Sequence, residues 1–224
     1  MKRSEINQLQ RQAVEFFADH QFYLPPWAYW DKEKWIQNRE RAREVIDNGL
    51  GWDLTDFGMG DFYNNGLLLF TVRNGRVDDP NGKDYAEKIM IVREEQVTPW
   101  HFHWSKMEDI INRGGGNLVI ELANATEDEK LADTPVTIQI DGVAHEVEAR
   151  GKIVLKPGES VSLPQYMYHN FYGEKDKGTV LVGEVSQVND DARDNRFLQE
   201  LPRFPQIDED EPVLYYLCNE YPVQ

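Results

Sequence analysis

The pattern of apolar and polar positions divides the chain near residue 50. Between residues 4 and 19, apolar side chains recur every three or four positions, which predicts an amphipathic helix with Ser4 as its N-cap. Residues 31–48 predict a second helix, which Asp31 caps and the Asn48–Gly49 pair ends. Residues 1–50 are therefore expected to form a helical extension.

From residue 51 onward, the spacing of apolar positions shortens to the alternation that strands require. Ten short segments predict strands: residues 67–72, 85–93, 98–104, 117–122, 136–140, 143–148, 152–155, 160–163, 167–172 and 179–185. Turn pairs separate most of them, and Asp141–Gly142 between two alternating runs is the strongest hairpin signal. So many short strands with regular turns predict a mainly β barrel or sandwich and not an α/β fold.

Charge and cysteine content restrict the partners and the location of the protein. The 224 residues include 40 acidic and 24 basic side chains, a net charge of −16. Such a surface repels nucleic acid and anionic membranes, whereas a small neutral sugar meets no such penalty. The single cysteine, Cys218, excludes an intramolecular disulfide. With no apolar signal region after Met1 and no run long enough to span a bilayer, the expected location is the cytoplasm.

A cluster of histidines and one glutamate supplies the candidate chemistry. His101 and His103 are two residues apart, so on a strand both imidazoles point to one face. Glu108 follows after a gap that allows its carboxylate to return on the next strand, and His169 lies in a later predicted strand. Three imidazoles and one carboxylate suit one divalent first-row metal with open positions for substrate oxygens. An isolated His-x-His pair, by contrast, is usually surface or core packing.

The first of two motifs resembles that of the cupin family, G-x5-H-x-H-x3,4-E-x6-G. The sequence gives His101-x-His103-x4-Glu108-x6-Gly115, and Glu95 stands where the leading glycine of the motif is expected. The departure does not affect a metal ligand.

The second cupin motif, G-x5-P-x-G-x2-H-x3-N, resembles residues 158–173. Here the chain reads Gly158-x5-Pro164-x-Tyr166-x2-His169-x3-Gly173, so the spacing holds while Tyr166 and Gly173 replace a glycine and an asparagine. The resemblance implies a cupin (double-stranded β-helix, jelly-roll) barrel, and it assigns His101, His103, Glu108 and His169 as the metal ligands.

A narrower resemblance covers nearly the whole chain. The two N-terminal helices, the Pro-Pro-Trp segment, the run at residues 98–108 and Arg-Gly-Gly-Gly-Asn at residues 113–117 are similar to the bacterial D-lyxose isomerase family. The resemblance implies a Mn²⁺-dependent isomerase that interconverts D-lyxose and D-xylulose and tolerates D-mannose. We expect one structural domain, in which residues 51–188 form the barrel, residues 1–50 pack on it and residues 189–224 wrap around it. The aromatic N-terminal segment and the apolar tail also favour a homodimer.

Aldose–ketose isomerisation requires a general base in addition to a metal that polarises the carbonyl oxygen. Lys106 lies between two ligands, and a lysine beside a bound cation can have a lowered pKa; the alternative is a solvated turn lysine. Glu184 stands in an otherwise apolar strand, where buried carboxylates usually have a role; the alternative is an edge-strand surface residue. We predict Lys106 and Glu184 as the catalytic residues.

Substrate binding is expected from the polar loop after residue 188 and from an aromatic side chain. Asp190, Asp191, Arg193 and Asp194 form a polar loop that can bind sugar hydroxyls, and we select Asp190 and Arg193 as substrate-binding residues, although an ordinary charged loop has the same composition. An aromatic side chain can stack against the C–H face of a sugar, although most aromatic residues of a barrel belong to its core. The candidates are Trp27, Trp30, Trp100, Trp104 and Phe171, of which we select Trp104.

Other functions of a cupin fold stay open at this stage, because the fold does not determine the reaction. A phosphorylated hexose would require a cluster of basic residues near the metal, and the sequence disfavours it: Lys88 and Arg93 face opposite sides of one predicted strand. Cupin dioxygenases or decarboxylases use the same ligand set, and a non-catalytic sugar-binding cupin would keep the barrel without the chemistry.

Overall fold

The computed structural model describes residues 1–191, 193–202 and 204–222. The helices are α1 (Arg3–Asp19), the short 3-10 helix η1 (Pro26–Tyr29), α2 (Lys32–Asn38) and α3 (Arg43–Asp47). The strands are β1 (Gly51–Thr55), β2 (Leu67–Arg73), β3 (Tyr85–Val92), β4 (Thr98–Phe102), β5 (Glu108–Gly115), β6 (Leu118–Asn124), β7 (Val136–Ile140), β8 (Val143–Val147), β9 (Lys152–Leu155), β10 (Ser160–Leu163), β11 (Met167–Gly173), β12 (Val180–Gln187) and β13 (Arg196–Phe197).

The strands form two antiparallel sheets that face each other across the main core. The larger sheet has the order β1-β2-β3-β12-β5-β10-β7-β8, and the smaller has the order β13-β4-β11-β6-β9. Apolar side chains from both sheets, among them Met90, Ile120, Leu122 and Val182, form one buried cluster between them. The prediction of a mainly β cupin barrel with N-terminal helices is therefore confirmed.

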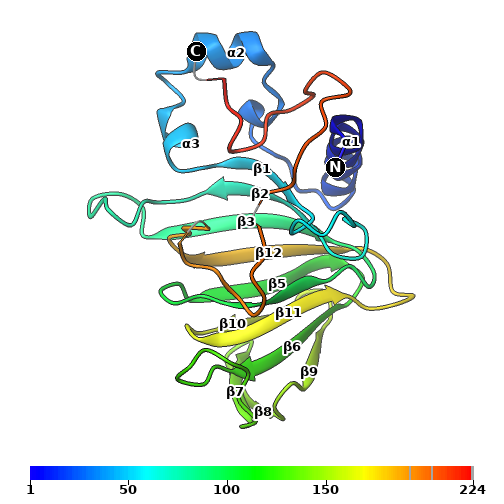
Figure 1. The fold of residues 1–224 in the computed structure, drawn as a ribbon, viewed down its shortest axis with the longest axis vertical. Helices are drawn as coiled ribbons and strands as arrows, with labels where there is room; N and C mark the ends of the chain where they lie inside the picture. Colours follow the sequence, from blue (N-terminus) through cyan, green and yellow to red (C-terminus); the bar gives the residue numbers. More distant parts are fainter. Residues whose placement is uncertain (192, 203, 223–224) are drawn as a thin grey trace.

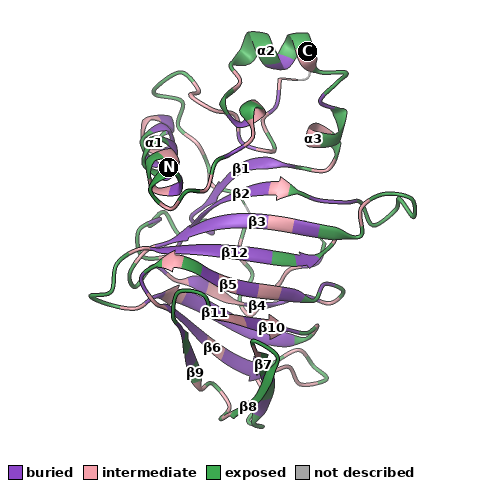
Figure 2. Cartoon of the chain, turned by 180° about the vertical axis from the view of Figure 1, so that it is seen from behind, coloured by how far each residue is buried: buried purple, intermediate pink, exposed green. Residues whose placement is uncertain are grey.

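Helix α1 covers the outer face of the larger sheet at its β1 end (Figure 1). Its apolar side chains, such as Ile6, Leu9 and Phe17, pack with Trp52 and Phe70 in a second buried cluster. Strands β1 to β3 and β12 are buried over most of their length (Figure 2). Strands β2, β3 and β12 each contribute side chains to a core on either face, whereas β1 contributes Trp52 and Leu54 to the cluster under α1.

Two details of the predicted helices are wrong. Lys2, not Ser4, is the N-cap of α1, because the backbone N–H and the hydroxyl of Ser4 both donate to the carboxylate of Asp210. The predicted helix at residues 31–48 is split into α2 and α3. The side chain of Asn38 donates to the carbonyl of Lys34, a local bond that competes with helix continuation. The cap by Asp31 is confirmed, because its side chain accepts from the backbone N–H of Lys34.

The ten predicted strands are present with small differences at their ends, whereas β1, β5 and β13 were not predicted. In β5, the polar residue Asn112 is completely buried, and its side chain donates to the carbonyls of Gly116 and Leu155. The sequence of β5 therefore lacks the alternation of apolar residues that predicts a strand. The Asp141–Gly142 hairpin between β7 and β8 is confirmed, with φ of 49° and 79° at its two turn residues.

The C-terminal tail packs within its own chain. Tyr215 and Leu217 join the cluster between α1 and the larger sheet, and Tyr221 packs on Trp35 of α2. Part of the predicted segment 189–224 lies outside the described residues, and the division of the chain at residues 50 and 188 within one domain stays a prediction. None of the helices in the described part of the chain has the length and hydrophobicity that a bilayer crossing requires.

Candidate functional site

Four side chains meet between the two sheets, inside the barrel. His101 lies on β4, His103 follows directly after that strand, and Glu108 is the first residue of β5. His169 lies on β11, opposite His101 in the ladder. One ligand atom of each residue lies within 4.8 Å of those of the other three, and all four residues are buried. Strand pairing thus brings together residues that are up to 68 positions apart (169 − 101).

The backbone orients all three imidazoles in the same way. The Nδ1 atoms of His101, His103 and His169 lie 2.8, 2.7 and 3.1 Å from the carbonyl oxygens of Pro99, Asp194 and Met167, respectively. A carbonyl oxygen only accepts, so each Nδ1 carries the hydrogen, and the neutral ring presents the lone pair of Nε2 to the site. Carbonyl partners of this kind commonly orient metal-bound histidines.

The charges at the site fit a divalent cation. Burial, followed by repulsion from the other two imidazoles, holds the pKa of His101 well below its usual range. Burial works to raise the pKa of Glu108, but Lys106 and His103 outweigh it and hold this pKa well below the ordinary value. Oε1 of Glu108 lies 3.1 Å from Nε2 of His169, yet that buried nitrogen has no hydrogen-bond partner of good geometry among the described residues. Neutral imidazoles around an ionised carboxylate are the ligand set that a first-row divalent metal prefers.

Lys106 points into the site because the chain turns between β4 and β5. Its Nζ lies 2.8 Å from Oε2 of Glu108 and 2.8 Å from Oε1 of Glu184, and its side chain is 2% exposed. Burial disfavours the ammonium form, but Glu108, Glu184 and Asp191 outweigh it and raise the pKa of Lys106. The carboxylates around Lys106 therefore favour its ammonium form. The lowered pKa expected from the sequence depends on a bound cation and stays a prediction.

Glu184 faces the same space from β12. It pairs across the ladder with Lys88 on β3 and with Ile110 on β5. Nζ of Lys88 lies 3.4 Å from Oε1 of Glu184, and both side chains are buried. The carboxylate therefore stands between two lysines, Lys88 and Lys106. Sequence reasoning considered Lys88 only as a possible phosphate ligand and did not predict its pairing with Glu184.

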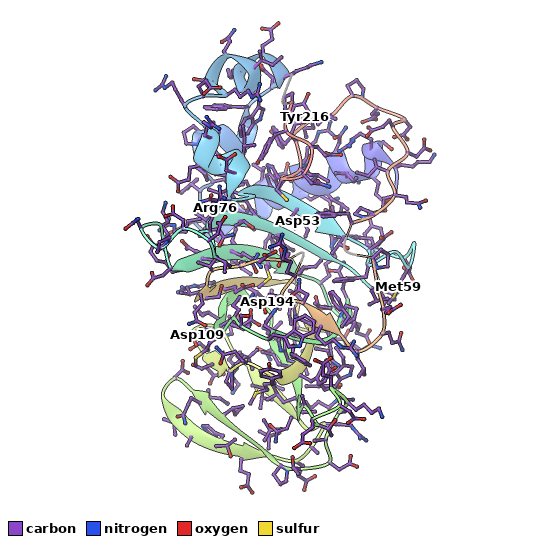
Figure 3. The ribbon with its side chains drawn as sticks, turned by 60° about the vertical axis from the view of Figure 1, so that its left-hand side comes forward. Asp53, Met59, Arg76, Asp109, Asp194 and Tyr216 are labelled. Atoms are coloured by element: carbon purple, nitrogen blue, oxygen red, sulfur yellow. The ribbon has the colours of Figure 1, made fainter. Side chains whose placement is uncertain are left out.

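The loop after β12 closes one side of the site. The carboxylate of Asp194 accepts from the backbone N–H groups of Ser105 and Lys106 at 2.8 and 3.0 Å, and its carbonyl accepts from His103. Figure 3 shows Asp194 at the height of the barrel strands, well away from the helices α2 and α3. Asn189 Oδ1 accepts from Lys88 and Lys106 at 2.8 and 3.2 Å. The sequence did not predict the hydrogen bonds of Asp194 to the turn after β4, or those of Asn189 to the two lysines.

A cavity that is partly open to solvent lies against these groups, with about 510 Å³ of empty space when the open part is included. Its polar lining includes His101, His103 and Glu108 of the converging group, together with Lys88, Lys106, Glu184 and Asp191. The apolar wall is formed by Phe57, Leu67, Leu69, Met90, Ile110, Phe171 and Phe197.

The three predicted substrate-binding residues do not line this cavity in the structure. The indole N–H of Trp104 donates to Glu129 at 2.8 Å, and its ring packs near Phe102 on the outer side of β4. Asp190 and Arg193 lie on the loop after β12. Of the predicted polar loop, Asp191 lines the cavity, and so does Asn195, which was not predicted.

Comparison with known proteins assigns the chain to a family. The model of a family described as D-lyxose isomerase matches residues 1–221. The chain belongs to the D-lyxose isomerase family. Its relatives include the D-lyxose/D-mannose isomerases of Serratia proteamaculans and Escherichia coli O157:H7, each 53% identical over 223 residues, which cover 99% of this chain and 98% of each relative.

Solved structures support the fold of this member of the D-lyxose isomerase family. The L-ribose isomerase of Cellulomonas parahominis with L-ribose superimposes with a TM-score of 0.62 at 17% identity, covering 93% of this chain and 98% of that one. The L-ribose isomerase of Geodermatophilus obscurus gives a TM-score of 0.59 at 18% identity, with coverage of 92% and 98%. At these identities the likeness establishes a shared barrel only.

Proposed function

We propose that the protein is a Mn²⁺-dependent aldose–ketose isomerase that interconverts D-lyxose and D-xylulose, and D-mannose and D-fructose. The observation that carries the proposal is the position of the Glu184–Lys106 pair beside a buried three-histidine, one-glutamate group in a member of the D-lyxose isomerase family. A proton-transfer pair next to a metal site is what this reaction requires.

The metal would be held by His101, His103, Glu108 and His169, the four residues whose ligand atoms converge. When bound, a divalent cation supplies Lewis-acid polarisation of the C1 and C2 oxygens of the open-chain sugar. We propose Mn²⁺ because the resemblance to the family implies it, and because imidazole and carboxylate ligands accept it.

Glu184 is the proposed general base. Both lysine contacts of its carboxylate are made by Oε1, at 2.8 Å from Lys106 and 3.4 Å from Lys88, which leaves Oε2 for the substrate. In the proposed step, Glu184 takes the proton from one of the carbons C1 and C2 of the sugar and returns it to the other. Because the same carboxylate transfers the proton to and from both carbons on one face of the sugar, one residue serves the reaction in both directions.

Lys106 is the proposed proton donor to the sugar oxygens. The surrounding carboxylates raise the pKa of Lys106 against the effect of burial, so it enters the reaction as an ammonium ion. An ammonium group stabilises negative charge that develops on the substrate. While Glu184 moves the proton between the carbons, Lys106 can donate its proton to the carbonyl oxygen and take up the proton that the neighbouring hydroxyl loses.

The charge balance of the cavity supports a neutral sugar in preference to a phosphorylated one. Among the described residues that line it, the lysines Lys88 and Lys106 are both paired with carboxylates. Three ionisable carboxylates, those of Glu108, Glu184 and Asp191, line the cavity beside these two lysines. Among the described residues of the lining, neither lysine is therefore left unpaired to bind a phosphate group. Trp104, Asp190 and Arg193 stay our predicted substrate contacts, although none of them lines the cavity in this structure.

Proton exchange in heavy water tests the proposal directly. Protein stripped of metal and reloaded with Mn²⁺ is incubated with D-lyxose in D₂O and followed by NMR. We expect D-xylulose with solvent deuterium at the carbon that Glu184 protonates. Product without deuterium would keep the isomerase and point to hydride transfer or a shielded base. Absence of product from both D-lyxose and D-mannose would refute the isomerase and direct attention to oxygen uptake.

We also propose that the protein is a cytoplasmic homodimer. The substrate class belongs to central sugar chemistry, and the single cysteine is consistent with a reducing compartment. Trp27 and Trp30 of the aromatic N-terminal segment contact Tyr216 and Tyr221 of the tail within one chain, so a dimer would use apolar side chains outside this contact that are exposed, such as Tyr23 and Val77. Light scattering coupled to size-exclusion chromatography measures the mass, and a mass equal to that of one chain would refute the dimer.

A further inference from the structure

A bulge in β4 changes which of its side chains face the cavity. His101 pairs with His169 and Thr98 pairs with Phe171, so three residue steps on β4 match two steps on β11. In a regular strand, residues three apart point to opposite faces. With one extra residue between them, Thr98 and His101 both line the catalytic cavity. The two residues inside the bulge, Pro99 and Trp100, line a separate surface groove instead.

The hydroxyl of Thr98 has no hydrogen-bond partner among the described residues, although the atom is buried and the whole residue is 4% exposed. The second threonine of the cavity, Thr55, behaves differently, because its Oγ1 accepts from the backbone N–H of Phe57 at 2.9 Å. Buried hydroxyl groups are normally paired, and an unpaired one in a cavity requires an explanation.

The remaining polar side chains of the cavity are engaged within the protein. Each of them takes part in an ion pair or a hydrogen bond: Thr55, Lys88, His101, His103, Lys106, Glu108, Glu184, Asp191 and Asn195. The apolar wall, to which Leu67, Leu69 and Phe171 belong, offers no hydrogen bond to a substrate. The hydroxyl of Thr98 is therefore available to form a hydrogen bond with a polyhydroxylated ligand in this cavity.

We propose that the Thr98 hydroxyl binds a hydroxyl group of the open-chain sugar and is a specificity-determining residue. The inference rests on the proposed function, in which the C1 and C2 oxygens face the metal-binding group. The hydroxyl that reaches Thr98 is consequently one at C3 or beyond. Because of the bulge, β4 places both a proposed metal ligand, His101, and a proposed substrate contact, Thr98, in the same cavity.

The hydroxyl has opposite effects on stability and on substrate use. In the free protein, burial of an unpaired hydroxyl is unfavourable, so an isosteric apolar side chain should stabilise the fold. In the complex, the same replacement leaves a sugar hydroxyl without its partner, which lowers kcat/KM. A residue that only packs would not combine a gain in stability with a loss of activity.

The test compares Thr98→Val with Thr98→Ser, and uses Thr137→Val on the exposed side of β7 as a matched control. For Thr98→Val we expect unchanged Mn²⁺ content, a higher urea midpoint and a loss of about tenfold in kcat/KM for D-lyxose. Thr98→Ser should keep most of the activity, and Thr137→Val should match the wild type in kcat/KM. Deoxy-lyxoses that lack one hydroxyl at C3, C4 or C5 identify the contact, because one of them should react equally with the wild type and Thr98→Val.

Binding of D-arabitol, the open-chain polyol of the same stereochemical series, provides a measurement that does not depend on turnover. Calorimetry of the Mn²⁺-loaded proteins should show about tenfold weaker binding to Thr98→Val. Equal D-arabitol affinity and equal kcat/KM would overturn the inference, as would a lower urea midpoint, which would place the hydroxyl in a bond within the protein. A wild type that binds D-arabitol but converts no sugar would refute the proposed function alone, and the Thr98 comparison would still be decided by affinity.

Discussion

Two different parts of the chain determine the orientation of the imidazoles. His101 and His169 each donate to a carbonyl two residues earlier in their own strand, so their orientation is set locally. His103 donates instead to Asp194, which is 91 residues away. His103 is therefore the ligand whose geometry depends on the correct docking of the loop after β12.

His103→Ala is expected to abolish metal retention and activity together. The substitution removes one of four converging ligand atoms, and the small side chain cannot replace the lone pair of Nε2. Metal affinity should fall by more than about a hundredfold, since even a lost outer-shell partner costs ten- to a hundredfold. Metal content after dialysis, measured by mass spectrometry, checks the prediction. His145→Ala on the exposed face of β8 is the control and should keep the metal.

Glu184→Gln is expected to keep the metal and lose turnover. The amide has nearly the same shape as the carboxylate, but it cannot accept the proton that a general base must take. We expect kcat to fall by roughly a thousandfold, within the range that general-base removal produces. Steady-state kinetics and metal content are measured on the same samples. Glu146→Gln on exposed β8 controls for the change of charge, and unimpaired turnover of Glu184→Gln would rule out this base.

The convergence of His101, His103, Glu108 and His169 could be predicted because its signal is local. A two-residue alternation places His101 and His103 on one face, and the motif spacing adds Glu108 and His169. The contacts of Glu184 with Lys88 and Lys106 could not be predicted in the same way. They depend on the order of β3, β12 and β5 in the sheet, and no periodicity along the chain encodes that order.

At the scale of elements, two turns have a left-handed backbone conformation at positions where the cupin motifs have glycine. Glu95 and Tyr166 stand at glycine positions of the motifs and have φ of 56° and 59°. Left-handed φ is unfavourable for residues with a Cβ, by about 1–2 kcal/mol. The chain keeps the turn geometry at this cost, so the departures from the motif do not alter the strands that carry the ligands.

The loop after β12 and the turn between β4 and β5 act together through one side chain. Asp194→Asn should weaken their contact, because a side-chain amide cannot accept from two backbone N–H groups with both of its heavy atoms. We expect kcat to fall ten- to a hundredfold, the usual effect of losing a group that orients an active site, with a faster loss of Mn²⁺. Stopped-flow metal release into a chelator measures the second effect.

The control for this loop is Asp84→Asn, the same substitution at an exposed position. It should match the wild type in both metal release and kcat. If Asp194→Asn lost stability but kept its rate of metal release and its kcat, Asp194 would be a structural residue only.

At the scale of the whole molecule, ion pairs and hydrogen bonds join the N-terminal helix to the C-terminal tail. Arg3, at the start of α1, is 1% exposed in its side chain and pairs with Glu209 and Glu220 of the tail. Ser4 and Asn7 of the same helix bond to Asp210 and Glu211. The sequence showed that the tail carries apolar residues and must pack, but not on what, because these contacts join positions more than 200 residues apart.

Arg3→Met should test how much this contact between the ends of the chain stabilises the fold. Methionine preserves much of the buried volume but removes hydrogen bonds to two carboxylates, so we expect a loss of about 1–3 kcal/mol in the free energy of unfolding at pH 7. Urea denaturation measures it. Arg11→Met, at an exposed position of the same helix, should change stability by less than about 0.5 kcal/mol.

The pH dependence of that difference identifies its cause. The hydrogen bond from Arg3 lowers the pKa of Glu209 below the ordinary value of a glutamate side chain. A group whose pKa is lower in the folded state stabilises the fold above the unfolded pKa, and this stabilisation is lost as the pH falls through the folded value. The gap between the wild type and Arg3→Met should therefore be constant above about pH 5 and narrow below it. A gap that is the same at pH 7 and in acid would show that Arg3 acts through packing and not through its charge.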